Sequence, residues 1–373
     1  MDRRDDRDGT PPPGLTYTSA VFEELVRGWD GELVATRFDE PTATWMFVGV
    51  HSTVLGPGFG GTRVKVYPTP HDALGDVLRL SSAMTFKNAM AGLPFGGGKA
   101  VLAVPVVPEG GERTELFHRY GELVASLGGS YVTACDMNTT ERDMDVVAER
   151  CPHVMGRTAA AGGSGSSAPN TAIGVYHGIR ASFARAFGSD DPSGRTVVVE
   201  GAGAVGSVLA GLLADSGARV VVADVLAERA RAVAERVGAV VVGPEEAFDV
   251  DCDLFSPCAT GGVLNAATIS RLRCRVVAGA ANNQLATLED ADRLAAAGIL
   301  YAPDYVVNAG GVLHLAGYER LGWTGDEMTA RLAGIGDTLR EVFDAAKRGN
   351  VTPAAAAWAI ATGRIETARL ERG

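Results

Sequence analysis

The first half of the chain carries its apolar positions in two alternating patterns. Short runs of strand-forming residues, with a period of two, are separated by turn residues. The strands expected from these runs cover 32–38, 44–54, 62–67, 100–104 and 130–136. Other segments have apolar residues three and four positions apart, which is the period of a helix. The helices expected from them cover 71–92 and 113–128.

The second half has a more regular pattern. A Gly/Ser/Ala-rich segment at 159–172 predicts a linker or hinge, and a helix is expected over about 171–188. Strands and helices then alternate from 195 to 306. Such alternation predicts βαβ units and a parallel sheet. The last segment, from about 326, has a helical pattern and no further strand.

Composition and charge narrow the class of protein. The 373 residues are 46% hydrophobic and 21% charged, which is typical of a globular chain too long for one small core. The net charge of −11, from 34 basic and 45 acidic residues, is unlike the basic patch of a nucleic-acid-binding protein. No apolar run reaches the ~18 residues of a membrane span. We therefore expect neither a nucleic-acid nor a membrane partner.

Cysteine and histidine usage favours a reducing compartment and no metal site. The five cysteines form no CxxC pair, which fits reduced thiols in the cytoplasm better than disulfides. The six histidines have no metal-ligand spacing. Residues 1–14 lack the apolar core of a secretory signal, and their charges and prolines predict a disordered tail.

A glycine-rich turn in the second half has the spacing of a dinucleotide-binding loop. It follows a predicted strand and opens a predicted helix, whose free N–H groups can receive phosphate. Its glycines allow the tight turn, the approach of the diphosphate and the packing of the helix on the strand. Asp224 ends the next strand, and an acid there accepts ribose hydroxyls and repels a 2′-phosphate, which favours NAD over NADP. The expected cofactor-binding residues are Gly201, Gly203, Ala204, Val205, Gly206 and Asp224.

A second glycine-rich turn, at 96–98, leads into Lys99 and resembles a phosphate cradle at first sight. The P-loop pattern fails, because Leu93 stands where it requires glycine and Ala100 where it requires Ser or Thr. Lys87 lies near the end of the largely apolar helix expected before this turn. A lysine in such a setting either holds an anion or loses its proton, because burial and a neighbouring cation both lower its pKa. One of each would suit an enzyme acting on an α-amino acid, although the residues alone equally allow two surface lysines.

Several motifs, these two turns among them, resemble those of the glutamate/leucine/phenylalanine/valine dehydrogenase family. The resemblance is closest to its leucine, phenylalanine and valine branch. The resemblance runs from about residue 20 to 350 and rests on seven motifs in the family's order: GPGFGGTR, MTFKNAMAGLPFGGGKAV, TACDMNTT, GAGAVG, SPCATGG, AGAANNQL and YAPDYVVNAGGV. It implies an NAD-dependent oxidoreductase that reversibly converts an L-amino acid into a 2-oxo acid and ammonia. It also implies a homo-oligomer assembled through the first domain.

The pattern and the resemblance together predict an α/β protein with two domains separated by a cleft. We expect an α/β catalytic and oligomerisation domain at 15–165 and a Rossmann-like NAD-binding domain at 166–340. The C-terminal helices, about 341–373, are expected to pack back on the first domain.

The resemblance also implies roles for individual residues. Lys87 resembles the lysine that binds the substrate carboxylate, and Lys99 resembles the catalytic lysine. Asp136 resembles the aspartate that carries protons to and from the amine, and Asn308 the asparagine near the amino group and the nicotinamide. Three further positions resemble residues that line the cofactor cleft: Thr171, Ala259 and Asn283.

The implied mechanism begins with hydride transfer from Cα to the cofactor, which leaves an iminium. Neutral Lys99 then activates a water that attacks the iminium carbon, and Asp136 protonates the departing ammonia. The glycines at 96–98 are expected to keep side chains away, so that Lys99 reaches the reacting carbon.

Phe59 predicts an apolar side chain on the substrate. The glutamate branch has a lysine at this position, and a phenyl ring cannot pair a buried carboxylate. Phe59 either shortens the pocket toward valine or 2-aminobutyrate, or stacks on an aromatic substrate, and the sequence leaves both open. Gly60, Met84 and Ala134 are expected in the pocket wall, with a contribution from the helix around 334–338.

Two other functions stay open from the sequence. A non-catalytic NAD-binding regulatory protein could use the same fold, but such a protein has no need of both Lys99 and Asp136. A 2-hydroxy-acid dehydrogenase normally requires a His–acid pair and an arginine for the carboxylate, and the sequence has no such motif.

Overall fold

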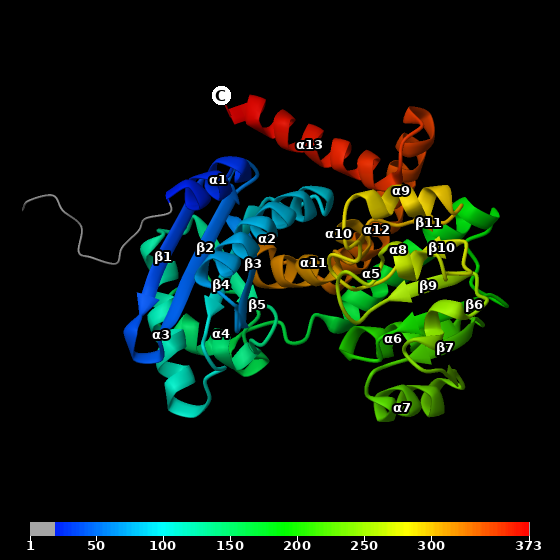
Figure 1. Cartoon of the computed structure of the whole chain (residues 1–373), viewed down its shortest axis with the longest axis horizontal. Helices are drawn as coiled ribbons and strands as arrows, with labels where there is room; N and C mark the ends of the chain where they lie inside the picture. Colours follow the sequence, from blue (N-terminus) through cyan, green and yellow to red (C-terminus); the bar gives the residue numbers. More distant parts are fainter. Residues whose placement is uncertain (1–18, 373) are drawn as a thin grey trace, which may run out of the picture.

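The structure is a computed structural model that describes residues 19–372. Its strands form two sheets that lie side by side, the first blue to cyan and the second green to yellow (Figure 1). The tail expected at 1–14 lies outside the described residues. Within 19–372 no helix combines the length and apolar character needed to cross a membrane.

The first sheet is mixed and has the strand order β1-β2-β4-β3-β5. β2 is antiparallel to both β1 and β4, whereas β3 pairs in parallel with β4 and β5. The strands are β1 (Leu33–Asp39), β2 (Thr44–Ser52), β3 (Gly58–Lys65), β4 (Gly96–Ala103) and β5 (Tyr131–Cys135).

Helices cover both faces of the first sheet. The short α1 (Ser19–Trp29) contacts α2 (Pro70–Met90), which packs on one face, while α3 (Gly110–Ser126) and α4 (Glu141–Ala148) pack on the other. On β4, Val101 joins the α2 cluster, and Ala100 and Leu102 join the α3–α4 cluster. Lys99 is two residues from Val101 and therefore lies on the α2 face, because strand side chains alternate between faces.

The expectation of a glycine-rich turn before Lys99 is wrong, because residues 96–98 begin strand β4. A Cβ at Gly97 would collide with the backbone and side chain of Thr85 on α2. A Cβ at Gly98 would collide with the ring of Tyr131. Pairing with strands on both sides outweighs the low strand propensity of glycine. Gly97 thus allows α2 to lie directly on β4, and Gly98 makes room for Tyr131 on the opposite face of the sheet.

The second sheet is entirely parallel and has the order β11-β10-β9-β6-β7-β8. The order turns around between β6 and β9, and ligands bind at such a reversal at the carboxyl ends of the strands. Its strands are β6 (Thr196–Glu200), β7 (Arg219–Ala223), β8 (Val240–Val241), β9 (Leu254–Pro257), β10 (Val276–Val277) and β11 (Leu300–Tyr301). The helices between these strands are α6 (Ala204–Asp215), α7 (Ala227–Val237), α8 (Ala266–Ile269) and α9 (Glu289–Ala296).

Three of the expected segment boundaries move in the structure. β3 begins four residues before the expected strand, again at glycines. α5 (Ala168–Phe187) starts within the predicted linker, with Pro169 in its first turn, a position that suits proline. The alternation was expected to reach 306, but its last strand stops at Tyr301, and α10 (Asp304–Val307) follows Pro303.

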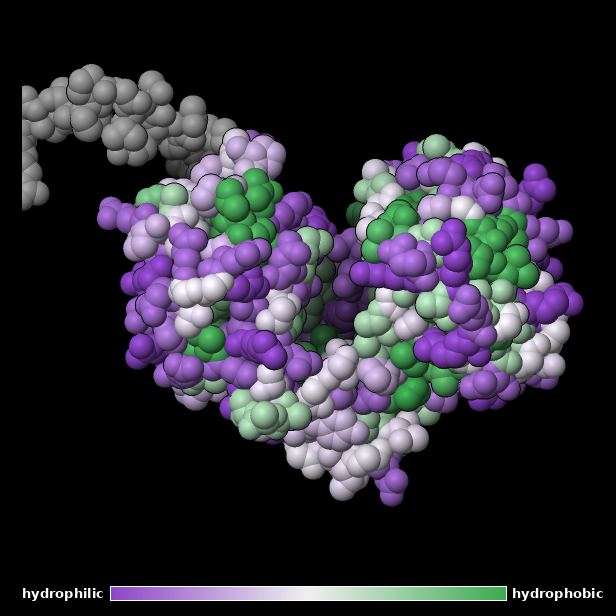
Figure 2. Space-filling view, turned by 90° about the horizontal axis from the view of Figure 1, so that it is seen from below, coloured by the Kyte–Doolittle hydropathy of each residue, from purple (hydrophilic) through white to green (hydrophobic). Residues whose placement is uncertain are grey.

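The C-terminal part of the chain connects the two sheets. It contains α11 (Gly310–Ala316), a π-helical turn (Gly317–Leu321), α12 (Gly325–Gly349) and α13 (Pro353–Arg372). In Figure 1, α13 runs from the side of the second sheet toward the first. Trp358 of α13 stacks on Phe86 of α2 with ring centroids 3.9 Å apart, and Arg364 donates to the carbonyls of Ala89 and Met90, 3.1 Å each. Seen from below, the molecule has two lobes with a deep hollow between them (Figure 2).

Candidate active site

A lysine–aspartate pair lies on the α2 face of the first sheet. Lys99 Nζ is 2.7 Å from Oδ2 of Asp136, which directly follows β5, and Lys99 is 6% exposed. β3 runs between β4 and β5. Its Gly61 makes room for the side chain of Asp136, because a Cβ at this position would be 2.8 Å from the Cβ of Asp136. Three adjacent strands therefore bring together the two residues expected to carry the acid–base chemistry.

The charges around Asp136 keep it ionised. Burial alone would raise the pKa of its carboxyl, but the charges of Lys99 and Arg63 lower that pKa to about 2. The sequence led us to expect a neutral Lys99 beside a second cation. The structure also places a carboxylate counter-ion, that of Asp136, in direct contact with Lys99, which this expectation did not include.

Lys87, near the end of α2, reaches across to the second sheet. Its Nζ donates to Oδ1 of Asn282, 3.1 Å away, and the Nδ2 of Asn308 donates to the same oxygen, 2.8 Å away. Burial lowers the pKa of Lys87 to about 8; the charge of Lys99 lowers it further, while Asp304 and Asp136 raise it. The expected carboxylate holder is thus a half-buried lysine whose charged form a bound anion would stabilise.

Phe59 and its neighbours form an apolar wall beside these groups. Phe59 is 1% exposed, its ring lies 5.5 Å from that of Phe95, and it belongs to the same hydrophobic cluster as Ala134. A Cβ at Gly60 would collide with the carbonyl of Gly98 and come within 3.1 Å of Met84 Cγ. The strand pairing explains why this position is glycine.

The glycine turn at the end of β6 fits a dinucleotide. Gly201 has φ +106°, and a Cβ there would be 2.7 Å from the amide nitrogen of Ala259. A Cβ at Gly206 would collide with the carbonyl of Gly201, whereas a Cβ at Gly203 would meet no packed atom within 4 Å. The space beside Gly203 and the first turn of α6, which contains Ala204 and Val205, match a loop that holds a diphosphate.

Asp224 is already bound to the backbone of this turn. Its Oδ2 accepts from the amide of Ala202, 2.7 Å away, and its Oδ1 accepts from the amide of Leu226, 2.8 Å away. Each carboxylate oxygen has a second lone pair, so Asp224 can shape the turn and still accept ribose hydroxyls.

Two of the expected cleft residues make no contact with the glycine turn. Thr171 lies at the start of α5, where its Cα and Oγ1 approach Gly310 and Gly311 just after Asn308. Asn283 has φ +52°, and its carbonyl accepts from the amide of Gly262, 2.7 Å away. Asn283 thus lies in the loop beside Asn282, and Thr171 lies in α5 against the segment that follows Asn308.

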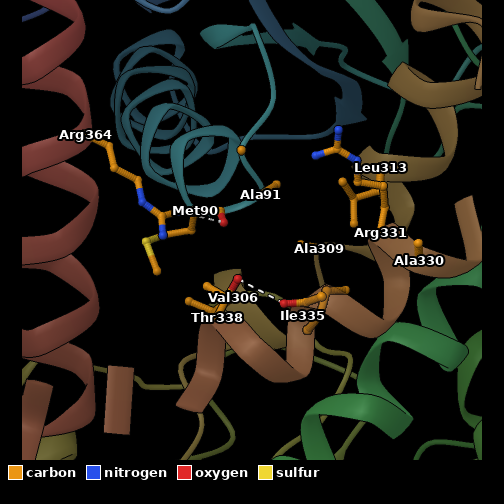
Figure 3. Close-up of a pocket in the computed structure, with 12 residues that line it drawn as sticks. Met90, Ala91, Val306, Ala309, Leu313, Ala330, Arg331, Ile335, Thr338 and Arg364 are labelled. Carbon is orange, nitrogen blue, oxygen red and sulfur yellow. Dashed lines mark hydrogen bonds between the residues drawn. The ribbon is translucent and has the colours of Figure 1, made fainter. Parts of the chain in front are cut away.

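The helix around 334–338 lines a cavity next to the end of α2. A cavity of about 220 Å³ lies between the end of α2, α10, α11, α12 and α13 (Figure 3). Gly334, Ile335 and Thr338 line it together with Met90 and Arg364, but neither Phe59 nor any residue of the lysine–aspartate group does.

In residues 19–372 no group of three or more His, Cys, Asp or Glu side chains could hold a metal ion.

Three residues of the site were missed by sequence reasoning. Arg63 contacts Asp136, Asn282 joins Lys87 to Asn308, and Asp304 raises the pKa of Lys87. Each lies within one of the quoted motifs, but spacing along the chain gives no sign that these motifs meet.

These features define an α/β protein that combines a dinucleotide-type turn on a parallel sheet with a lysine–aspartate pair on a mixed sheet. The family model "Glu/Leu/Phe/Val dehydrogenase, dimerisation domain" matches residues 42–153, and "Glutamate/Leucine/Phenylalanine/Valine dehydrogenase" matches residues 223–373. The chain belongs to the glutamate/leucine/phenylalanine/valine dehydrogenase family.

Individual relatives are similar over nearly the whole chain. A leucine dehydrogenase of Thermoactinomyces intermedius is 40% identical over 94% of this chain and 95% of its own length. A valine dehydrogenase of Streptomyces albus is 46% identical over 91% of this chain and 94% of its own length. The crystal structure of L-tryptophan dehydrogenase from Nostoc punctiforme has a TM-score of 0.80 and 36% identity, covering 93% of this chain and 99% of the other.

Proposed function

We propose that the chain is an NAD-dependent L-amino acid dehydrogenase that reversibly converts an apolar L-amino acid into its 2-oxo acid and ammonia. The observation that carries this proposal is the contact of 2.7 Å between Lys99 Nζ and Asp136 Oδ2, with Lys87 held on the same face. Family membership supplies the class of enzyme, and this trio supplies the groups that the reaction needs.

The family's dehydrogenases use a pyridine nucleotide, which accepts the hydride from Cα of the amino acid. Gly201, Gly203 and Gly206 would hold its diphosphate against the first turn of α6. We favour NAD over NADP because the carboxylate of Asp224 would repel a 2′-phosphate. The hydrogen bonds from Ala202 and Leu226 to this carboxylate fix its position beside the turn.

The residues of the first sheet would divide the remaining chemistry. The ammonium group of Lys87 binds the substrate carboxylate and so orients Cα. Lys99 and Asp136 share a proton across their contact; when this proton lies on Asp136, neutral Lys99 takes a proton from the water that attacks the iminium carbon. Asp136 then gives its proton to the amino group, which leaves as ammonia. The reverse sequence serves amination of the 2-oxo acid.

The apolar wall would select the substrate's side chain. Phe59 is almost fully buried and one side of its ring packs on Phe95, so the ring occupies space that a longer side chain would need. We therefore favour a small branched side chain over an aromatic one. The identity of 46% to a valine dehydrogenase agrees with this preference.

We also propose a homo-oligomer built through the first sheet. The matched family model carries the description "dimerisation domain". Among the described residues β1 pairs only with β2, so its outer edge is open. Phe38 and Trp45 oppose each other on these strands and are 45% and 37% exposed, which favours a second copy at this edge.

The test is oxidation of NADH with ammonia and a panel of branched, straight-chain, phenyl, indolyl and dicarboxylic 2-oxo acids. We expect the highest kcat/KM with small branched acids and very little turnover of 2-oxoglutarate. Lys99→Ala should lower kcat by roughly 10²–10⁴-fold without changing NADH affinity. Lys65→Ala, at the exposed end of β3, is the matched control. No turnover of any acid by the unchanged chain would favour the regulatory alternative.

A further inference from the structure

Arg63 is a buried cation in contact with the proposed proton carrier. It lies on β3, and its side chain is 13% exposed. Its Nε donates to Asp136 Oδ2 at 3.3 Å, the same oxygen that Lys99 approaches to 2.7 Å. Asp136 is therefore held between two cations that come from neighbouring strands.

A network behind Arg63 fixes the direction of its guanidinium group. Its Nη1 donates to Oδ2 of Asp76 on α2, 2.9 Å away. The carboxylate of Asp76 also accepts from the hydroxyl of Tyr67 at 2.6 Å and from Arg79 at 2.8 Å. Because the guanidinium group is planar and is held at one end by Asp76, its Nε–H points to Asp136 in one direction.

The two cations next to Asp136 differ in what the reaction does to them. Lys99 must give up its proton to activate water, and its attraction for the carboxylate is then lost. Arg63 keeps its charge at every pH at which proteins are folded. A permanent cation disfavours the protonated form of Asp136, so it drives Asp136 to pass its proton on to the leaving amine.

We propose that Arg63 is a positioning residue that orients the carboxylate of Asp136 toward Lys99 and keeps it a ready proton donor throughout the reaction. The kinetic consequence rests on the proposed dehydrogenase function; the effect on Asp136 itself does not. The charged groups around Asp136 are Lys99 from β4, Arg63 from β3 and Lys87 from α2. Asp76 is the counter-ion that holds Arg63.

The test replaces Arg63 and follows the pH dependence of turnover. Arg63→Gln should lower kcat by roughly 10- to 100-fold with little change in the KM for the 2-oxo acid or in NADH affinity. The limbs of the pH profile should move to higher pH by about one unit, because removing the cation beside Asp136 makes proton loss from the site harder. Arg63→Lys, which keeps the charge without the planar fork, should restore the limbs but only part of kcat.

Arg79→Ala is the matched control, because Arg79 also binds Asp76, is 54% exposed and has no contact with Asp136. It should leave the pH limbs in place. If Arg63→Gln lowers only thermal stability, or raises KM while the limbs stay fixed, the role is merely structural and the inference is wrong. If Arg63→Gln does not fold, the pH limbs and the kcat of Arg63→Lys decide the question.

A readout without turnover separates this inference from the proposed function. With ¹³C-carboxyl-labelled aspartate, the resonance lost in Asp136→Asn identifies Asp136. Its titration midpoint should rise by about one unit in Arg63→Gln. If the unchanged chain turns over no 2-oxo acid, the proposed function fails, yet this midpoint still decides whether Arg63 controls Asp136. An unchanged midpoint would overturn the inference.

Discussion

At the scale of a single residue, Lys87 adds one pH-dependent charge to this site. Burial lowers its pKa to about 8, and only Asp304 and Asp136 act against that effect. The free site therefore holds a lysine that is charged below about pH 8 and neutral above it. In the proposed role of Lys87, a substrate carboxylate would bind the charged form, so substrate binding and protonation of Lys87 would be linked.

This linkage predicts how the affinity for a carboxylate varies with pH. An apolar monocarboxylate without an amino group is the suitable ligand, because it has no ionisation of its own in this range. Its inhibition constant, measured with saturating NADH, should be constant below about pH 8. Above that pH the inhibition constant should rise by about tenfold per pH unit, because the protonated fraction of Lys87 falls about tenfold per unit.

Lys87→Arg is the control for this experiment, because a guanidinium group stays protonated at these pH values. The variant should bind the inhibitor more weakly at neutral pH, since the planar group fits the site differently. In this variant the inhibition constant should no longer begin to rise near pH 8. A break that persists in this variant would assign the titration to another group.

At the scale of elements, the packing of α2 on β4 brings Lys87 and Lys99 to the same place. Gly97 is the point of closest approach, because a Cβ there would meet the backbone nitrogen and hydroxyl of Thr85. Gly97→Ala should therefore push α2 away from the sheet and destabilise the protein by about 1–3 kcal/mol. Because Lys87 and Lys99 lie on these two elements, turnover should fall as well.

Gly75→Ala gives a matched comparison on the same helix. Gly75 lies within α2, and a Cβ there would meet no packed atom within 4 Å. Alanine is the better helix former there, so this variant should gain about 0.5–1 kcal/mol. Calorimetric unfolding of both variants should move the midpoints in opposite directions. Equal midpoints would mean that the close approach at Gly97 does not limit stability.

The elements also separate what the sequence could predict from what it could not. The alternation after residue 195 and the glycine turn at 201–206 are local patterns, and the structure has the expected parallel sheet. The segment 96–98 looked like a turn because three glycines disfavour a strand. It is a strand because β2 and β3, both distant in sequence, pair with it. Local propensity carries no information about such partners.

The same limit applies to the candidate site. Lys99 and Asp136 were found from motifs, and they do meet. Arg63 and Asn282 were missed, although their motifs were quoted, because their roles depend on contacts across strands and between the two sheets. The residues of a site can therefore be listed from one chain, whereas the network that orients them requires the three-dimensional arrangement.

At the scale of the whole molecule, one side chain joins the two halves of the cleft. Asn282 lies in the loop after β10, and its Oδ1 accepts from both Lys87 of α2 and Asn308 of the segment after β11. These two bonds link the element that is to hold the substrate carboxylate with the one expected near the nicotinamide. We infer that these bonds help to hold Lys87 of the first half close to Asn308 of the second half.

Asn282→Ala removes the shared acceptor and tests this link. A hydrogen bond to a charged group contributes about 1.5–3 kcal/mol, so kcat/KM for the 2-oxo acid should fall roughly 10- to 100-fold. NADH affinity should change little, because the glycine turn is untouched. Small-angle X-ray scattering should give a larger radius of gyration, since the halves lose a contact across the cleft.

The control must lose stability without touching the cleft. Asn265 caps α8 through the amides of Ala267 and Thr268, and Asn265→Ala should cost about 1 kcal/mol of stability. It should leave kcat/KM and the radius of gyration unchanged. Equal losses of kcat/KM in Asn265→Ala and Asn282→Ala would trace the effect to general destabilisation. A loss confined to Asn282→Ala, together with the larger radius, would tie catalysis to the contact between Lys87 and the second sheet.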